Sequence, residues 1–505
     1  ISTLVADFDT SVTTIQAVIT LYCLVMAMFM LTGAKIGDIL GRRRAFVIGL
    51  VVYGFGSAVT AVSQTVLQLA LGWSILEGLG AALVMPALAA LIAGNFEGAS
   101  RKAAYAVIGS GDAVGPILGG WATTELSWRI VFAGEVVLVL LILALTPRVH
   151  DAVLEGRKPK LDGVGTVLSA AGVGLVVLGT LQSSSWGWLQ PKDSPVTPFG
   201  FSLTPWVIAA GALCLWGFVQ WQHRRESQGK DPLVHLSLLR IPPLRAGLIG
   251  LFSQNLILMG AFFVIPLYLQ LVLGFDALET GIKMLPVSIL MFLASAIGAR
   301  LSTRFSVRGI VRSGLVTTTV GVLWLLATVD PELNETGFAL AMAVLGAGMG
   351  LLASQLGNVV QSSVDSSGRG EAGGLQYTGQ QLGSSLGVAL IGAIVISGLA
   401  GVFISQVKND SRISAEIQSQ VTVAVEPGID FLSAAQVETI ATDAGLDAAT
   451  TAAIVEDYST AQLQALKAGL LVAALLALGS LAFTRDLPHD DPRKTGTDQP
   501  QLATA

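Results

Sequence analysis

The amino-acid sequence predicts an all-α protein whose helices cross a membrane many times. Of its 505 residues, 52% are hydrophobic and only 12% are charged, whereas a soluble globular domain carries about 25% charged residues. The mean hydropathy is +0.70, and the 57 glycines follow no collagen-like period. The third observation is a series of long apolar runs, each close to the ~20 residues that a spanning helix needs.

Each apolar run predicts one spanning helix. Several runs contain proline or many glycines, which a spanning helix tolerates when neighbouring helices satisfy the freed backbone groups. Roughly thirteen spans are predicted, at 13–34, 45–64, 66–93, 102–123, 129–146, 163–182, 205–221, 245–273, 280–300, 310–328, 337–361, 373–400 and 461–484.

Lysine and arginine lie in every second connection between these spans. Loops that carry such residues stay on the cytoplasmic side, so the basic connections and the C-terminal tail are expected to be cytoplasmic. An odd number of spans then places residue 1 outside, as expected for a chain that lacks one preceding helix. The basic residues are Arg42, Arg43, Arg44, Arg101, Lys102, Arg157, Lys158, Lys160, Arg224, Arg225, Lys230, Arg304, Arg308, Arg312, Arg369, Arg493 and Lys494.

Composition and motifs exclude several classes of function. The chain has no basic domain, so nucleic acid is not an expected partner. Cys23 and Cys214 lie in apolar runs, which argues against a disulfide framework or a metal site. The four histidines lie in connections or the tail, and no Walker loop occurs. The sequence therefore predicts a protein that is not an enzyme and needs no cofactor and no metal.

A faint internal repeat divides the chain. GAKIGDILGRRR (33–44) follows one span of the first half, and GARLSTRFSVR (298–308) follows a span of the second half. Both begin Gly-Ala and carry basic residues at similar spacing, with Thr303 in place of the aspartate. Repeated halves are typical of secondary transporters.

Two stretches are unlike membrane helices. Residues 405–459 are rich in Asp and Glu, contain amphipathic patches, and are expected outside. Residues 486–505 form a polar tail whose composition predicts disorder.

Two motifs indicate a family. GAKIGDILGRRR resembles the signature loop between helices 2 and 3 of the major facilitator superfamily, Gly-x-x-x-Gly/Ala-Asp-Arg-x-Gly-Arg-Arg/Lys. GDAVGPILGG (111–120) resembles the antiporter signature of helix 5 in its drug:proton antiporters. The N-terminal stretch is similar to the segment after helix 1 in the fourteen-helix branch. The resemblance implies two six-helix bundles plus two extra helices, with the first helix absent from this chain.

The resemblance gives the first motif a role in an inner gate. In the family the aspartate, here Asp38, caps a helix of the opposite half and pairs with motif arginines. A carboxylate at a helix N-terminus is favourable by about 0.3–1 kcal/mol, which suits a latch that must also open. Ile39 stands where the family usually has a basic residue, and a topology anchor alone is the alternative role. The expected gate residues are Gly33, Gly37, Asp38, Gly41, Arg42 and Arg43.

The second motif implies an antiporter packing hinge. Small residues let helices approach closely, and Pro116 removes a backbone hydrogen bond and kinks the helix. Generic helix packing is the alternative, because Gly and Pro are common in membrane helices. The motif residues are Gly111, Gly115, Pro116, Gly119 and Gly120.

Three acidic residues within the spans are candidates for proton coupling, because ionisable groups inside a membrane are costly and often functional. Glu77 lies mid-span in a stretch that resembles the helix 4 signature, with Ser74 where the family has arginine. It can carry a proton or be a satisfied structural carboxylate. For Asp112, a role as a proton or cation site and a role as a structural hydrogen-bond acceptor are about equally expected. Glu135 is expected to pair with Arg129, a structural role.

Polar and aromatic residues of the spans predict a cavity lining. Such side chains face the bundle interior, where their polar groups find partners. For any single residue, a helix–helix hydrogen bond is the alternative. The cavity candidates are Tyr22, Asn255, Phe262, Gln355, Asn358, Tyr377 and Gln380.

The expected function is proton-coupled export of lipophilic drugs or toxic compounds, with cations favoured by the acidic candidates. The alternatives are an exporter of one endogenous metabolite or lipid, and a transport-inactive membrane sensor or assembly partner. The expected partners are a small-molecule substrate, protons and the lipid bilayer, and the expected state is a monomer in the plasma membrane, the inner membrane of a bacterium. The expected domains are 1–146 (N-terminal bundle, helices 2–6 of the family), 147–235 (two additional helices), 236–485 (C-terminal bundle with the loop 405–459) and 486–505 (tail).

Overall fold

The computed structural model is helical, with no strand, over the residues that it describes. These are residues 4, 7–10, 12–96, 100, 104, 119, 122, 126–150, 160–192, 194–365, 368–425 and 431–489. Within them, twelve helices are long and apolar enough to cross a membrane, judged by length and composition. They coincide with twelve predicted spans, which confirms the all-α membrane class. The other predicted span, 102–123, lies outside the described residues except at three isolated positions.

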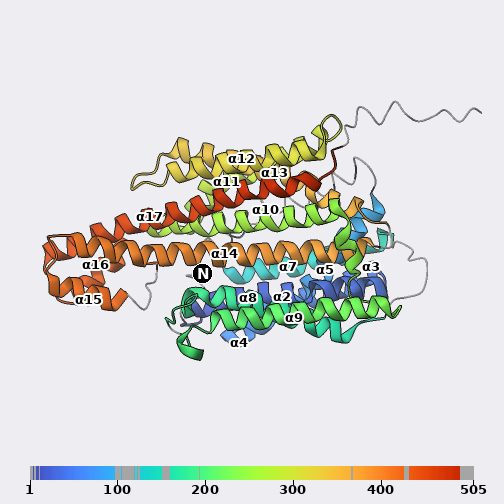
Figure 1. Ribbon diagram of the computed structural model, residues 1–505, viewed down its shortest axis with the longest axis horizontal. Coiled ribbons are helices and arrows are strands. Elements are labelled where there is room, and N and C mark those ends of the chain that lie inside the picture. The colour runs from blue at the N-terminus through green and yellow to red at the C-terminus, as the bar shows by residue number, and fades with distance from the viewer. Residues whose placement is uncertain are drawn as a thin grey trace, which may run out of the picture.

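The N-terminal part of the chain forms one group of helices (Figure 1). A π-helical segment interrupts its third rod, and such segments are often found at functional sites. The elements are α2 (Val12–Leu40), α3 (Arg42–Ala61), the rod α4–η1–α5 (Val66–Leu69, Ala70–Glu77, Gly78–Asn95), α7 (Trp128–Leu145) and η2 (Thr146–Arg148).

The C-terminal part forms a second group, in which α14 and α17 are longer than their predicted spans. They continue beyond the other helices to carry α15 and α16 at one end of the molecule (Figure 1). Residues 405–459 are therefore largely helical where described. The elements are η4 (Leu236–Arg240), α10 (Pro242–Leu267), η5 (Tyr268–Val272), α11 (Ala277–Leu301), α12 (Val307–Ala327), α13 (Glu335–Ser362), α14 (Arg369–Asn409), α15 (Ala415–Val425), α16 (Ala434–Asp443), α17 (Ala448–Ser480) and η6 (Leu481–Asp486).

Two further helices, α8 (Gly163–Trp186) and α9 (Thr204–Ser227), lie between these groups in the chain and are joined through η3 (Pro198–Gly200). They pack against each other, and α8 contacts both α2 and α14. The extra pair is thus placed where the two halves meet.

Capping side chains explain where many helices begin. The carboxylate of Asp162 accepts a hydrogen bond from the Gly165 backbone N–H, and Ser306 does the same for Gly309. Asp276 forms a capping box with Glu279 at the start of α11. Each cap satisfies a backbone N–H that the first helical turn leaves without a partner.

The two copies of the internal repeat occupy equivalent places. Gly33 lies so close to α5 that an added Cβ would overlap the Ala82 carbonyl oxygen, and one on Gly298 would overlap Ser354 Oγ of α13. In each half, glycine thus permits contact with the helix two spans further along. We call the end of the bundle that carries the connections after α2, α9, α11 and α13 the motif-loop end.

The outer face of α7 explains why this chain needs a lipid environment. Val137, Leu138, Leu140 and Leu141 are each more than half exposed. Contiguous apolar surface of this kind is unfavourable in water but matches the hydrocarbon of a bilayer.

Candidate functional site: a cavity between the halves and its gate

A cavity of about 330 Å³ lies between the two halves. Its walls come from α2 and α5 of the first half and from α10, α11, α13 and α14 of the second half. A volume of this order is typical of a site for a small organic molecule.

The described walls combine thioethers and amides. Thioether side chains are polarizable and adapt to varied apolar shapes, whereas amides donate and accept hydrogen bonds at fixed positions. Tyr377 adds one aromatic ring, and no Asp, Glu, Lys or Arg belongs to the described lining. The thioethers and amides belong to Met26, Met30, Met85, Met291, Gln254, Asn255, Asn358, Gln376, Gln380 and Gln381.

One wall group has no hydrogen-bond partner among the residues that the structure describes. The Gln254 side-chain oxygen is buried and accepts no hydrogen bond within the described residues. The neighbouring amide of Asn255 is held, because its Nδ2 donates to the Leu251 carbonyl oxygen at 3.0 Å. A buried acceptor without a donor is unfavourable, so a molecule that donates a hydrogen bond to Gln254 would remove that cost.

The predicted cavity residues divide into two sets. Asn255, Asn358, Tyr377 and Gln380 line the cavity. The other three lie elsewhere: Tyr22 packs on Trp73 with ring centroids 6.5 Å apart, Gln355 donates to the Gly298 carbonyl oxygen at 2.9 Å, and Phe262 packs on the core of the second half.

Sequence reasoning missed the methionines. Met26 and Met30 are one helical turn apart in the run MAMFM, which places them on one face of α2. Their spacing was a readable signal, but a core position gives the same pattern.

Two of the acidic candidates belong to one cluster of polar side chains between α3, η1 and α7, and Tyr53 of this cluster packs on Met26 and Met30 of the cavity wall. Thr60 Oγ1 donates to Glu77 at 3.3 Å, and Ser57 Oγ donates to Glu135 at 3.0 Å. Tyr53 OH also donates to Glu135, at 3.3 Å. The hydrogen-bond partners of these carboxyl groups, among described residues, are hydroxyls rather than cations. Two carboxylates in one cluster repel each other, and a bound proton relieves that repulsion.

The expected pairing of Glu135 with Arg129 is wrong. Arg129 instead donates to the Ser63 carbonyl oxygen at 2.9 Å and pairs with Asp7 at 3.7 Å. The helical spacing of 129 and 135 is compatible with contact, but α7 turns Glu135 toward the hydroxyls of α3.

Close backbone approach brings this polar cluster together. An added Cβ on Gly56 would come within 2.8 Å of the Glu77 Cγ. Glu77 is the last residue of the π-helical segment, whose wider turn aims it at α3. The carboxyl is 1% exposed, so proton exchange there depends on motion of these helices.

The motif loop contacts the opposite half at the start of α14. Asp38 is buried against the α14 backbone, where a Cβ on Gly370 would overlap its carboxylate. The positive end of the α14 dipole favours this negative charge. Arg42 Nη2 lies 3.8 Å from the Asp38 carboxylate, and Gly41 adopts a φ of +99°, which favours glycine. The charged side chains of this loop and its tight turn at Gly41 thus both lie at the start of α14.

This contact closes the cavity toward the motif-loop end. On α2 the cavity residues are Met26 and Met30, and Asp38 follows Met30 by about two turns. Gly374 of α14 approaches so closely that an added Cβ would lie 2.7 Å from the Ala34 Cβ. The two halves therefore touch directly between the cavity and the motif loop.

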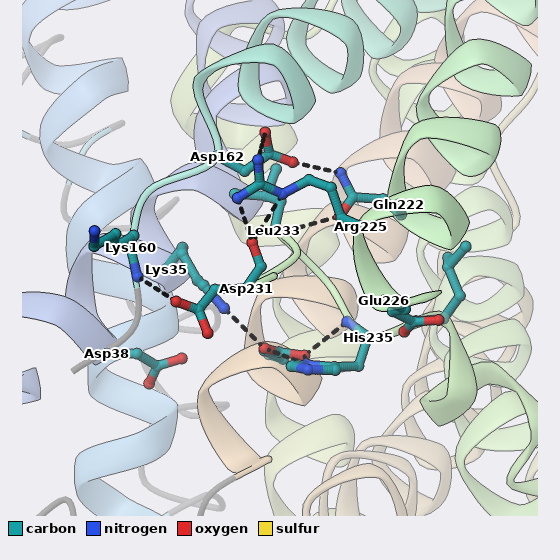
Figure 2. A network of polar contacts seen from close by, with 12 residues as sticks. Lys35, Asp38, Lys160, Asp162, Gln222, Arg225, Glu226, Asp231, Leu233 and His235 are labelled. Atoms are coloured by element: carbon teal, nitrogen blue, oxygen red, sulfur yellow. Dashed lines mark hydrogen bonds and ion pairs between the residues drawn. The ribbon is translucent and has the colours of Figure 1, made fainter. Parts of the chain in front are cut away.

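A second contact between the halves lies beside Asp38. Lys35 Nζ donates to Glu371 Oε1 at 3.2 Å, and both side chains are buried. The backbone N–H of His235 donates to Glu371 Oε2 at 2.9 Å. Figure 2 shows a second group of polar contacts nearby, which holds the segment before His235 and reaches Asp162. Neither Lys35 nor Glu371 nor His235 stood out in the sequence, because each is distant from the others along the chain.

Part of the predicted site lies outside the described residues. This applies to Asp112 and to the antiporter motif apart from Gly119. Their roles stay predictions.

Comparisons with known proteins give one consistent result. A model of the Major Facilitator Superfamily matches residues 1–388. The "Tetracenomycin C resistance and export protein" of Streptomyces glaucescens is 28% identical over 406 residues, covering 79% of this chain and 72% of that protein. The "Probable actinorhodin transporter" of Streptomyces coelicolor is 32% identical over 416 residues, covering 78% and 68%. The "Multidrug efflux pump LfrA" of Mycolicibacterium smegmatis is 28% identical over 484 residues, covering 94% and 89%.

Solved structures show the same fold. The human organic anion transporter MFSD10 matches with a TM-score of 0.58 at 13% identity, covering 93% of this chain and 83% of that chain. The proton:xylose symporter XylE matches with a TM-score of 0.50 at 13% identity, covering 98% and 93%. At this identity the likeness concerns the fold alone.

Proposed function

Because the chain belongs to the major facilitator superfamily, we propose that it is a proton-coupled antiporter that exports lipophilic drugs or toxic compounds. Its relatives are drug and antibiotic export and resistance proteins, which supports export of such compounds. The observation that carries proton coupling is the pair Glu77 and Glu135, held by hydroxyl groups beside a cavity between two halves.

In this mechanism the halves rock around the cavity. A drug enters while the motif-loop end is open, and the Asp38 and Lys35 contacts then close that end. Protonation of the carboxyl pair from the other side accompanies release of the drug, and the proton leaves toward the motif-loop end when the gate reopens. Inward proton movement thereby drives outward movement of the drug.

The cavity chemistry bears on which drugs are carried. Thioethers and Tyr377 suit flat apolar rings, and the amides suit their carbonyl and hydroxyl groups. A cationic substrate would need a carboxylate, and the remaining candidate for contact with it is Asp112. We therefore propose lipophilic ring systems as the substrate class, with a cationic group recognised only if Asp112 reaches the cavity.

A second candidate is export of one endogenous metabolite. The Gln254 oxygen, which has no partner among the described residues, favours a ligand with a matching donor. The relatives named after tetracenomycin C and actinorhodin are consistent with single products. Uptake of several unrelated dyes would favour the drug exporter, and uptake of one hydroxylated compound alone would favour the second candidate.

We place the protein in the plasma membrane, the inner membrane of a bacterium, as a monomer with the motif-loop end and the C-terminal tail in the cytoplasm. The basic residues at the motif-loop end support this orientation. Inverted vesicles then expose the loading side to the medium.

Replacing Tyr377 with alanine tests the role of the cavity. Uptake of ethidium and of an uncharged anthraquinone dye into inverted vesicles is measured under an imposed pH gradient. Loss of one aromatic contact of about 1 kcal/mol should raise the KM about fivefold for a dye that binds there, with little change in the maximal rate. The matched control is Phe199→Ala, which removes an exposed ring on η3 outside the cavity. An unchanged KM for every transported dye would contradict the cavity as the binding site.

A further inference from the structure

The segment that joins α9 to α10 is fixed by the extra helices. Gln222 on α9 donates to Asp162 at 3.0 Å and accepts from the Leu233 backbone N–H at 2.8 Å. Arg225 donates to the Asp231 carbonyl oxygen at 2.8 Å, and Asp162 is completely buried. The segment therefore has a defined position rather than a free path between two helices.

The segment between α9 and α10 reaches the gate at His235. Leu233 and Val234 are buried against α2 and α9, and this fixes the position of His235 beside α14. The His235 ring Nδ1 lies 2.9 Å from both carboxylate oxygens of Glu371. Glu371 is thus the point where the first half, the second half and the extra-helix segment meet.

The three groups differ in their access to water. The side chains of Lys35 and Glu371 are 3% and 8% exposed, whereas that of His235 is 49% exposed. A buried carboxylate that loses its only cation is strongly destabilised. Opening the gate separates α2 from α14 and removes Lys35 from Glu371. His235 can stay, because its segment also packs on Leu375 of α14 and runs directly into α10 of the second half.

We propose that His235 is a positioning residue of the gate, a second counter-ion that keeps Glu371 paired when Lys35 leaves and so eases opening at the motif-loop end.

The charge state of His235 sets the strength of this effect. The hydrogen bond to Glu371 raises the pKa of His235 above its ordinary value. Protonated His235 both pairs with Glu371 and repels Lys35, and the two effects favour opening together. Nearby Lys35 lowers this pKa, so the pKa of His235 is higher in the open gate than in the closed gate. The contribution to opening is fully present below the closed-gate pKa and is lost as the pH rises through the open-gate pKa.

Other charged groups near the contact define its surroundings. Glu226 on α9 accepts from the Leu236 backbone N–H at 2.8 Å and adds negative charge beside His235. Among the described residues, the other charged groups around the contact are Asp38 from α2, Arg42 from α3, Arg225 and Glu226 from α9, and Asp231 from the connecting segment (Figure 2).

The test measures the gate directly. Spin labels are placed at the exposed positions Leu40 and Thr303, on opposite halves at the motif-loop end, in a full chain whose Cys23 and Cys214 are changed to alanine. The distance between the labels is measured at about pH 8 and about pH 5.5, on either side of histidine titration. In the parent, the fraction with the longer distance should rise about fivefold at the lower pH.

Two substitutions at His235 should each make the open fraction independent of pH, one at the alkaline value and one at the acidic value. His235→Gln keeps a hydrogen-bond donor without the charge, so the open fraction should stay at its alkaline value at both pH values. His235→Lys carries a permanent charge and should hold the acidic value at both. The matched control is His223→Gln, a histidine of α9 whose ring lies 4.0 Å from Glu226, and it should behave as the parent does.

A pH response retained in His235→Gln, or absent from the parent, would overturn the proposal. A merely structural role would make the glutamine and lysine variants deviate alike, and that result would also overturn it. The proposal rests on the proposed transport cycle, but the distance between the two spin labels can be measured without any transport. A protein that moves no dye and still shows the response refutes the proposed function alone.

Discussion

Glu77→Gln is expected to lower pH-gradient-driven drug uptake into inverted vesicles by about 100-fold, the order expected when a positioned proton-transfer group is removed. Glutamine has almost the same volume and can still accept from Thr60, so the helix contacts around it should persist. It cannot bind and release a proton. Binding of the dye, measured by fluorescence without a gradient, should stay within about twofold, because Glu77 does not line the described cavity.

Two further variants show whether the loss of uptake arises at this pair of carboxyl groups. Glu135→Gln changes the other carboxyl group of the cluster and should also reduce gradient-driven uptake, because the two share one hydroxyl environment. Glu438→Gln on α16 changes an exposed glutamate outside this cluster and should have no effect. Full uptake by both Glu77→Gln and Glu135→Gln would move the proton site to Asp112 or elsewhere.

Asp38→Asn is expected to destabilise the closed gate and to slow export about 100-fold. The Asp38 carboxylate is buried between Arg42 and the start of α14. Removing one partner of a buried ion pair costs about 3 kcal/mol, because the other charge stays buried without compensation. The protein would then remain open at the motif-loop end.

A cysteine at position 380 reports this state independently of transport. In inverted vesicles it should react faster with a membrane-impermeant maleimide in Asp38→Asn than in the parent. The matched control is Asp486→Asn, which removes an exposed aspartate paired with Arg245 at 2.7 Å and should leave labelling unchanged. Equal labelling rates in Asp38→Asn and the parent would show that Asp38 only orients the loop.

The sequence predicted the helices well, because a membrane demands long apolar runs. Twelve predicted spans have counterparts in the described structure. The ends were less accurate: α14 continues to Asn409 because its last turns pack on α15 rather than lying in lipid. The motif loop was predicted as a unit, since its glycines and charges are adjacent in the chain.

The side-chain partners at the candidate site were not predicted, because they depend on contacts between residues that are distant in the sequence. Glu135 was assigned to Arg129 by helical spacing, but the hydroxyls of another helix decided its position. His235 and Glu371 lie 136 residues apart and meet because the extra helices fix the segment between α9 and α10. A methionine in an apolar span is expected in the packed core, and only the arrangement of the two halves shows that it lines a cavity.

The most direct test of proton-coupled export uses the full chain, purified and reconstituted into liposomes that enclose a pH-sensitive dye. An outward drug gradient is imposed without a pH gradient. Coupled exchange predicts proton movement against the drug flux, abolished in Glu77→Gln and stopped when the drug gradient is removed. Drug flux without proton movement in the parent chain would contradict the proposed coupling.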